Sequence, residues 1–185
     1  AAAEAGADRS RLPDVAGLPE LTFPEVQTAE LSNGMKVVLA ERHAVPVVEV
    51  SVQFDAGYAA DQGARLGRAG FTMDLLDEGT KSRSALDLSA ALETLGANLS
   101  TNTTLDTASV DLSALKQTLT ESVSIMADVI RNPAFAEDEI ARKKPQWLAR
   151  IRQEKAQPVS LALRELPPLL YGEGHAYSVP FTGSG

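Results

Sequence analysis

The chain has 185 residues, enough for one domain with a hydrophobic core or for part of a larger domain. Its formal net charge of -8 argues against nucleic-acid binding, and the lack of cysteine excludes disulfides, thiolate zinc sites and cysteine nucleophiles. No apolar run approaches the roughly 18 residues that a membrane-spanning helix needs.

Residues 1–24 are predicted to form an N-terminal extension. The segment is rich in alanine and then carries Pro13, Pro19 and Pro24, which favour extended backbone. It has no apolar core of a signal peptide. Its small-residue start fits a bacterial chain trimmed after export, and fits an arbitrary starting point equally well. We expect a periplasmic or secreted protein.

The next segments alternate with the period of β-strands. Residues 28–31 and 35–41 flank Ser-Asn-Gly at 32–34, and the Asn-Gly pair is typical of a tight primed turn with positive φ angles. A second long strand is predicted for residues 47–57. Its apolar side chains alternate onto one face, namely Val48, Val50, Val52 and Phe54.

Helical patterns follow and then flank a further pair of strands. Helices are predicted at 67–76 and 84–95, the second with Ser84 as N-cap and Gly96 as C-terminal stop. Strands are predicted at 97–103 and 107–115. Three more helices are expected at 119–131, at 137–157 with a kink at Pro145, and at 159–170 with a break at Pro167 and Pro168.

This order predicts an α+β fold, with an antiparallel β-sheet and helices packed on one side of it. Residues 25–185 would form one domain. Since residues 171–185 read as a loop without a closing element, we expect the domain to be incomplete at its C-terminus.

The residues that could bind a metal or perform catalysis are few. His43 and His175 are far apart and have no partner at helical spacing, so each is predicted to be an ordinary surface or loop residue. There is no G-x-S-x-G, no phosphate-binding G-x-x-x-x-G-K and no G-x-G-x-x-G. The remaining charges are predicted to be solvated: the pairs Asp77-Glu78 and Asp138-Glu139, and the cations Arg142, Lys143, Lys144, Arg150 and Arg152.

Several phrases, in order, resemble the pitrilysin/insulinase family of zinc metallopeptidases, the processing peptidase-like proteins. LSNGMKVVLAERHAVPVVEVSVQFDAGYAADQ resembles the family's first hairpin and strand, with Gln62 near its usual acidic position. LETLGANLSTNTTLDTASVDLSAL resembles its next strand pair, and NPAFAEDEIARKKPQWLARIRQEKAQP its long helix. GHAYSVPFTGS resembles "hPYgxpxxG". The match covers about residues 25–185.

The family's zinc motif is missing from this frame. Members have G-x-A-H-x-x-E-H followed by G-T, where this chain has GRAGFTMDLLDEGT from Gly67 to Thr80. The two histidines and the glutamate base fall at Gly70, Asp74 and Met73. The later metal-binding carboxylate falls at Arg150 and a supporting acidic position at Lys143. The resemblance therefore implies that this chain cannot bind catalytic zinc.

Two ion pairs are possible where the metal ligands would converge. We expect Asp74 to pair with Arg150, or with Lys143, and so to connect the two helices. Phe71, Leu75 and Leu76 would keep the packing role of the motif helix.

The resemblance implies a non-catalytic half of a zinc metallopeptidase. Such a half forms chamber wall and substrate contacts beside a homologous zinc-containing half, in the same polypeptide or another. Peptide would add as a strand beside Ser100, Thr101 and Thr103. Two alternatives stay open: an active zinc peptidase with a site rebuilt from Asp74, His175 and nearby carboxylates, and a peptide-binding scaffold without a peptidase partner.

Overall fold

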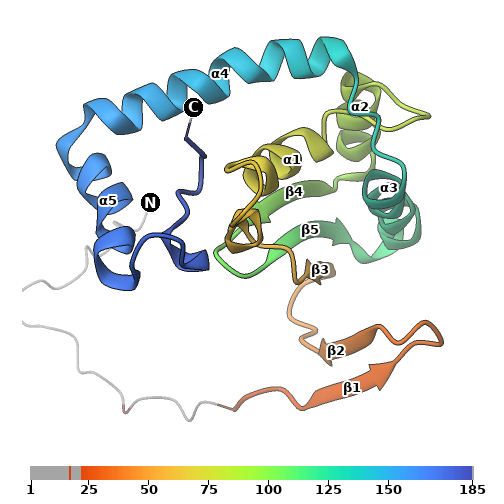
Figure 1. Cartoon of the computed structure of the whole chain (residues 1–185). Helices are drawn as coiled ribbons and strands as arrows, with labels where there is room; N and C mark the ends of the chain where they lie inside the picture. The colour runs from red at the N-terminus through yellow and green to blue at the C-terminus, as the bar shows by residue number, and fades with distance from the viewer. Residues whose placement is uncertain (1–16, 18–21, 185) are drawn as a thin grey trace, which may run out of the picture. The chain divides into compact units, whose positions relative to one another are not determined.

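The computed structural model describes residues 17 and 22–184 (Figure 1). The chain divides into two compact units, Ala1–Val45 and Pro46–Gly185, and each is considered by itself. The predicted extension at residues 1–24 lies outside the described residues apart from 17 and 22–24. The domain boundary predicted at residue 25 stays a prediction.

The first unit contains an antiparallel hairpin of β1 (Val26–Glu30) and β2 (Lys36–Ala40), with Glu30 opposite Lys36. The predicted primed turn is wrong, because Gly34 has a positive φ of 83° but Asn33 does not. The Gly34 N–H donates to the Leu31 carbonyl at 2.9 Å, which closes an ordinary turn before the glycine. Asn33 Oδ1 accepts from the Met35 N–H at 3.1 Å and stabilises that alternative.

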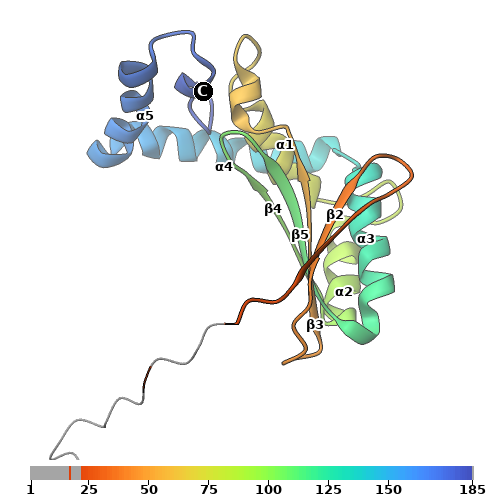
Figure 2. The ribbon, with the colours of Figure 1, turned by 90° about the horizontal axis from the view of Figure 1, so that it is seen from below.

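The second unit is built on a three-stranded antiparallel sheet. Its order is β3 (Val47–Phe54), β5 (Ala108–Leu115), β4 (Asn98–Thr103), so β5 is central. Val50 and Leu99 both lie opposite Leu112 of β5. Figure 2 shows α1, α2 and α3 on one side of this sheet, which confirms the predicted fold class.

The helices begin and end close to their predicted positions. They are α1 (Arg68–Leu76), α2 (Ala85–Leu95), α3 (Leu119–Arg131), α4 (Glu137–Ala156) and α5 (Pro158–Tyr171), with short 3-10 turns η1 (Tyr58–Asp61), η2 (Lys116–Thr118) and η3 (Ala176–Ser178). Ser84 caps α2 in a reciprocal capping box with Asp87, and Gly96 ends the helix with a φ of 61°. None of the described helices is both long and apolar enough to cross a membrane.

Two predictions concern prolines within helices. Helix α4 includes Pro145, and the kink predicted there stays a prediction. The expected break at Pro167 and Pro168 is wrong, because α5 continues through both to Tyr171. Each proline removes one backbone donor. No residue of α5 is buried, so water can reach the carbonyl groups that lose their partners.

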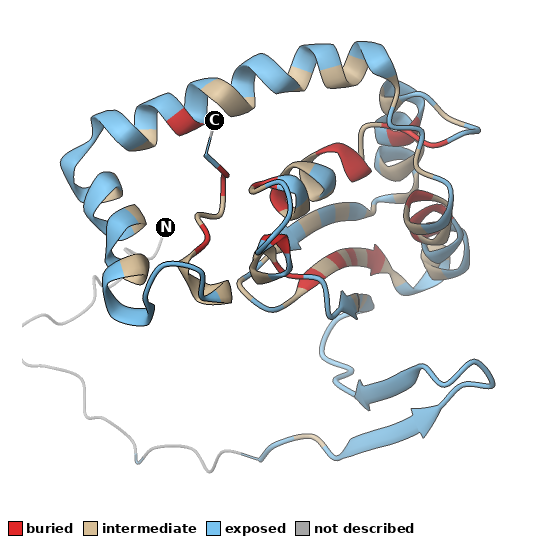
Figure 3. Cartoon of the chain, in the orientation of Figure 1, coloured by how far each residue is buried: buried red, intermediate tan, exposed pale blue. Residues whose placement is uncertain are grey.

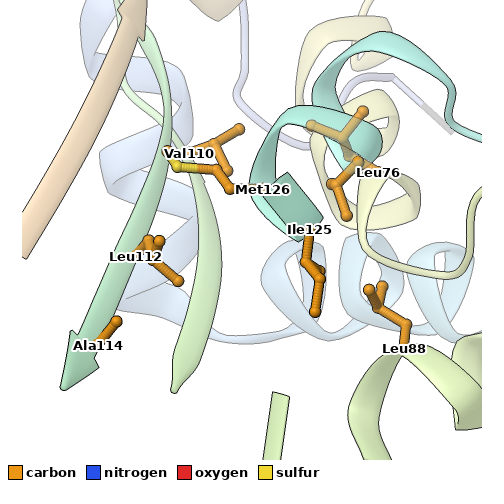
Figure 4. Packing of buried hydrophobic residues seen from close by; sticks show 8 residues of the cluster. Leu76, Leu88, Val110, Leu112, Ala114, Ile125 and Met126 are labelled. Atoms are coloured by element: carbon orange, nitrogen blue, oxygen red, sulfur yellow. The ribbon is translucent and has the colours of Figure 1, made fainter. Parts of the chain in front are cut away.

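The core lies between the sheet and the three helices that cover it. Alternate residues of β5 are buried, as the bands along this strand in Figure 3 show. Figure 4 shows their side chains meeting those of the helices. The cluster consists of Leu76, Leu88, Val110, Leu112, Ala114, Ile125, Met126 and Val129. This packing fixes α1 against the sheet.

Two leucines of α2 test this core. Leu88 is 2% exposed and Leu86 is 83% exposed. We expect Leu88→Ala to lower the free energy of unfolding by about 2–5 kcal/mol, since it leaves a cavity. Leu86→Ala should change it by less than about 0.5 kcal/mol. Urea denaturation of both variants measures the difference, and similar losses would contradict the packing described.

Candidate functional site

Helix α1 lies between the edge strand β4 and the long helix α4. Its N-terminus is held by Asp61, a buried carboxylate that accepts from the Ala69 N–H at 3.1 Å. On the β4 side, Thr101 Oγ1 donates to the Met73 carbonyl at 2.8 Å. On the α4 side, Lys143 Nζ lies 3.3 Å from Asp74 Oδ2. The structure therefore brings Met73, Asp74, Lys143 and Thr101 together.

Gly70 is buried against the indole ring of Trp147. A Cβ atom at Gly70 would lie 3.2 Å from two ring carbons of Trp147 and 3.2 Å from the Phe181 carbonyl oxygen. An imidazole needs far more room than a methyl group. The space beside Gly70, with which the resemblance aligns the family's first zinc-binding histidine, is thus filled by other parts of the chain.

Trp147 is held firmly in this place. Its Nε1–H donates to the Thr182 carbonyl at 2.8 Å. Its ring lies 5.5 Å from that of Phe71 and 6.0 Å from that of Phe181, centroid to centroid. Phe71 thus keeps a packing role, and Leu75 and Leu76 are buried as predicted.

The C-terminal segment, which includes Phe181, Thr182 and Gly183, packs against the N-terminal end of α1. It passes between α1 and α5 (Figure 1), and Thr182 is 1% exposed. Gly67 and Gly183 both have positive φ, and their backbones touch so closely that a Cβ on Gly67 would lie 2.5 Å from the Thr182 carbonyl oxygen. Only glycine fits such an approach.

Met73 is the residue that the resemblance aligns with the family's glutamate base. It is partly buried and packs against the hydrophobic core. A thioether is a weak acceptor that does not take a proton from water near neutral pH. This position supplies apolar contact where the active motif needs a general base.

The ionic contact between α1 and α4 runs through Lys143. Its ammonium group lies 2.8 Å from Glu78 as well as 3.3 Å from Asp74, and Arg142 also binds Glu78. Of the two pairs expected for Asp74, the structure contains the one with Lys143. The prediction that Glu78 and Lys143 are simply solvated is wrong, since their side chains are each only 17% exposed, whereas Arg142 is exposed as predicted.

These contacts move several pKa values. Partial burial works to raise the pKa of Glu78, but hydrogen bonds from Lys143 and Arg142 outweigh it and hold this pKa below its usual value. Burial also opposes the charge on Lys143, yet Glu78 and Asp74 keep its pKa above the ordinary value. Burial raises the pKa of the neighbouring Asp77, which was also expected to be solvated.

Arg150 does not approach Asp74 closely enough to pair with it. Its guanidinium lies over the rings of Trp147 and Phe181, and its Nε is 3.4 Å from Glu154. A permanent cation here opposes binding of a second cation.

The residues at this helix crossing do not fit a catalytic zinc ion. Zinc in peptidases takes three protein ligands, whereas Gly70 offers none and Asp74 is bound by Lys143. Within residues 22–184, no group of three histidine, aspartate or glutamate side chains could hold a metal. His43 contacts Glu41 at 3.0 Å, and His175 Nδ1 accepts from the Tyr177 N–H at 3.1 Å.

Strand β4 presents the three predicted substrate-binding residues differently. It pairs with β5 and with no other described strand, so its second edge is open. Ser100 is exposed, whereas the Thr101 hydroxyl is engaged with Met73 and the Thr103 hydroxyl is buried with no hydrogen-bond partner in the described part of the chain. Thr101 and Thr103 could therefore meet a peptide only through their backbone groups.

Sequence reasoning missed Trp147, Phe181 and Thr182. The available signal was the single tryptophan of the chain, placed on the predicted long helix opposite a glycine that replaces a histidine. Pattern alone does not show which ring fills which space.

Comparison with known proteins agrees with this geometry. A family model described as "Insulinase (Peptidase family M16)" matches residues 36–177 of this chain. The chain belongs to this family. The β subunit of the rat mitochondrial-processing peptidase is 33% identical over 139 residues, which cover 75% of this chain and 28% of that protein. Subunit 1 of the bovine mitochondrial cytochrome b-c1 complex is 28% identical over 132 residues, 71% of this chain and 27% of that protein.

Solved structures resemble the chain as well. The crystal structure of a peptidase M16 inactive domain from Pseudomonas fluorescens superposes with a TM-score of 0.81 at 31% identity, over 86% of this chain and 39% of that one. A protease from Helicobacter pylori has the same fold, with a TM-score of 0.77 at 19% identity over 88% of this chain and 39% of that one. The M16 chain described here spans little more than a quarter of the length of the curated relatives it matches.

The pH dependence of stability tests the Lys143–Glu78 contact. The folded protein holds Glu78 at a lowered pKa, so its contribution is present above the usual glutamate value of about 4.3 and is lost as the pH falls through the folded value. We expect the free energy of unfolding to fall less steeply below about pH 5 in Lys143→Met than in the parent chain.

Lys144→Met is the matched control for this measurement. Lys144 is the exposed neighbour on α4, and this variant should keep the parent slope. Chemical denaturation at a series of pH values gives all three slopes. Equal slopes in Lys143→Met and the parent chain would show that the contact does not shift Glu78.

A double-mutant cycle tests the packing of Trp147 on Gly70. Gly70→His should cost about 1–3 kcal/mol of stability, because the new side chain must displace the indole. Combined with Trp147→Ala, the added cost of Gly70→His should fall by about 1 kcal/mol or more. Thr72→His, on the exposed side of the same helix, is the control and should stay within about 0.5 kcal/mol of the parent. Strict additivity in the cycle would contradict the contact.

Proposed function

We propose that this chain is a non-catalytic domain of an M16 peptidase. It acts beside a homologous half that carries zinc, either in the same polypeptide or in another, and the assembly is located in the periplasm or secreted. The observation that carries this proposal is the packing of Trp147 and Phe181 against Gly70, which leaves no room for the first metal ligand.

The domain would contribute wall and peptide contacts to a closed chamber. The open edge of β4 supports this role, since unpaired backbone groups on an edge strand accept an extended peptide. The face of the sheet that α1, α2 and α3 do not cover is polar. It carries hydroxyl–carboxylate contacts such as Ser109 to Asp111 at 2.7 Å and Ser113 to Glu49 at 2.6 Å. A face of this kind suits contact with water and peptide better than burial in a dry interface.

The alternative of a rebuilt zinc site finds less support. It requires Asp74 and His175 as ligands, but Lys143 occupies the Asp74 carboxylate and would repel an incoming metal. His175 is stacked on Tyr171, with ring centroids 5.2 Å apart, and belongs to the N-cap of η3. A peptide-binding scaffold without a peptidase partner is the remaining alternative. A zinc-containing half that associates with this chain would favour the proposal over this alternative.

Metal content and reconstitution test the proposed function. We expect the purified chain, incubated with zinc and then desalted, to retain less than about a tenth of an equivalent by mass spectrometry of the metal. It should not cleave a quenched fluorescent peptide by itself. Addition of the sibling protein or domain with an intact H-x-x-E-H motif should produce cleavage above the level of the sibling alone.

Two results would oppose the proposal. Zinc retained near one equivalent per chain, and lost in Asp74→Asn, would indicate a rebuilt metal site. A sibling that neither binds this chain nor changes its own activity in its presence would favour the scaffold alternative.

A further inference from the structure

Arg150 presents a guanidinium group in a fixed orientation at the surface. Its Cζ lies 5.5 Å from the centroid of the Trp147 ring and 5.2 Å from that of Phe181, while the side chain is 54% exposed. Contact with two aromatic rings restrains a side chain that is otherwise flexible. Less conformational entropy is then lost when the group binds a ligand.

The positive charge of Arg150 is only partly compensated. The nearby carboxylate, Glu154, accepts from Thr182 Oγ1 at 2.6 Å and pairs with Arg164 at 3.2 Å, both through Oε2. Arg150 reaches its other oxygen only through Nε, at 3.4 Å. Two guanidinium groups thus share one carboxylate. Because the Arg164 side chain is 10% exposed and that of Arg150 is 54% exposed, the excess charge is accessible at Arg150.

A series of contacts links this cation to the residue that follows β4. Phe181, under the Arg150 guanidinium, also contacts Tyr58, with ring centroids 5.4 Å apart. The Tyr58 N–H donates to the carbonyl of Thr104, the residue that follows β4, at 3.1 Å. Arg150 is thus connected to Thr104 through the rings of Phe181 and Tyr58 and one backbone hydrogen bond.

We propose that Arg150 binds a carboxylate of a peptide that lies along the edge of β4. The inference rests on the proposed function, because it assumes that this edge receives a peptide. The planar guanidinium can donate two parallel hydrogen bonds to a carboxylate, and the two rings beneath it keep that fork facing outward. The carboxylate is a peptide C-terminus or an acidic side chain, which share this chemistry.

A purely structural role for Arg150 makes a different prediction. An arginine that only covers the rings would lower stability when replaced, through lost packing, but would not alter which peptides bind. The test must therefore measure the selectivity of binding and not stability alone.

The fluorescence of Trp147 provides the measurement, since it is the only tryptophan in the chain and lies beneath Arg150. Four hexapeptides without tryptophan serve as probes. One pair differs only in a free or amidated C-terminus, and the other, amidated in both members, carries an internal glutamate or glutamine. We expect at least one carboxylate peptide to bind about tenfold more tightly than its neutral match, with the difference shrinking at high salt.

Arg150→Gln should abolish this difference. Arg152→Gln, an exposed arginine two residues along α4, is the matched control and should keep it. Arg150→Lys keeps the charge without the fork and should restore only part of the preference. Thermal melts of the three variants, followed by circular dichroism, show that each is folded.

The pattern of affinities decides between the possible results. Whichever pair shows the preference identifies the source of the carboxylate. If all four peptides bind equally, or if Arg150→Gln keeps the preference, the inference about Arg150 is overturned while peptide binding at β4 stands. If none binds, this inference falls as well, and the metal and reconstitution experiment decides the proposed function separately.

Discussion

The contact between the Trp147 indole and Gly70 is the interaction on which the rest of the site depends. It requires a residue without a side chain on α1 and a large ring on α4. Together these two residues set how closely the two helices approach each other. The same ring binds the Thr182 carbonyl and so holds the C-terminal segment, whose Gly183 meets Gly67 backbone to backbone. A single aromatic side chain thereby connects three segments that are distant in the sequence.

The ionic contacts around Lys143 add a second connection between the same two helices. Lys143 serves Asp74 and Glu78 together, and Arg142 adds to the charge near Glu78. Partial burial makes the ions costly, so their hydrogen bonds must offset the lost hydration, and the net gain in stability is modest. Their main effect is on geometry. An indole ring and an ammonium group join the two helices.

The two parts of the proposed function depend on different groups. Trp147 and the Phe181 carbonyl pack against Gly70, while the edge strand β4 contacts the Met73 carbonyl through Thr101. The proposed absence of catalysis therefore does not conflict with the proposed peptide contact at β4. Arg150 stands out in this setting, because its charge is neither buried nor fully compensated.

Much of the fold was predictable from the sequence because its signals are local. The alternation at Val48, Val50 and Val52, the Ser84 cap and the Gly96 stop each depend on neighbours within a few residues, and the structure confirms them. The turn at Asn33 and the helix through Pro167 were predicted wrongly. In each case the chain adopted a conformation other than the one its local sequence favours. An Asn33 side-chain hydrogen bond replaced the primed turn, and solvent exposure tolerated the missing donors of α5.

The sequence by itself determined that Gly70, Met73 and Asp74 do not form an H-x-x-E-H motif, because a side chain that is absent from the chain cannot be supplied by folding. Only the tertiary structure decided what replaced it. Lys143 rather than Arg150 pairs with Asp74, and Trp147 rather than solvent fills the space beside Gly70. The physical reason is distance along the chain: Lys143 lies 69 positions after Asp74 and Trp147 lies 77 after Gly70, and no local pattern records which side chains meet across such a separation.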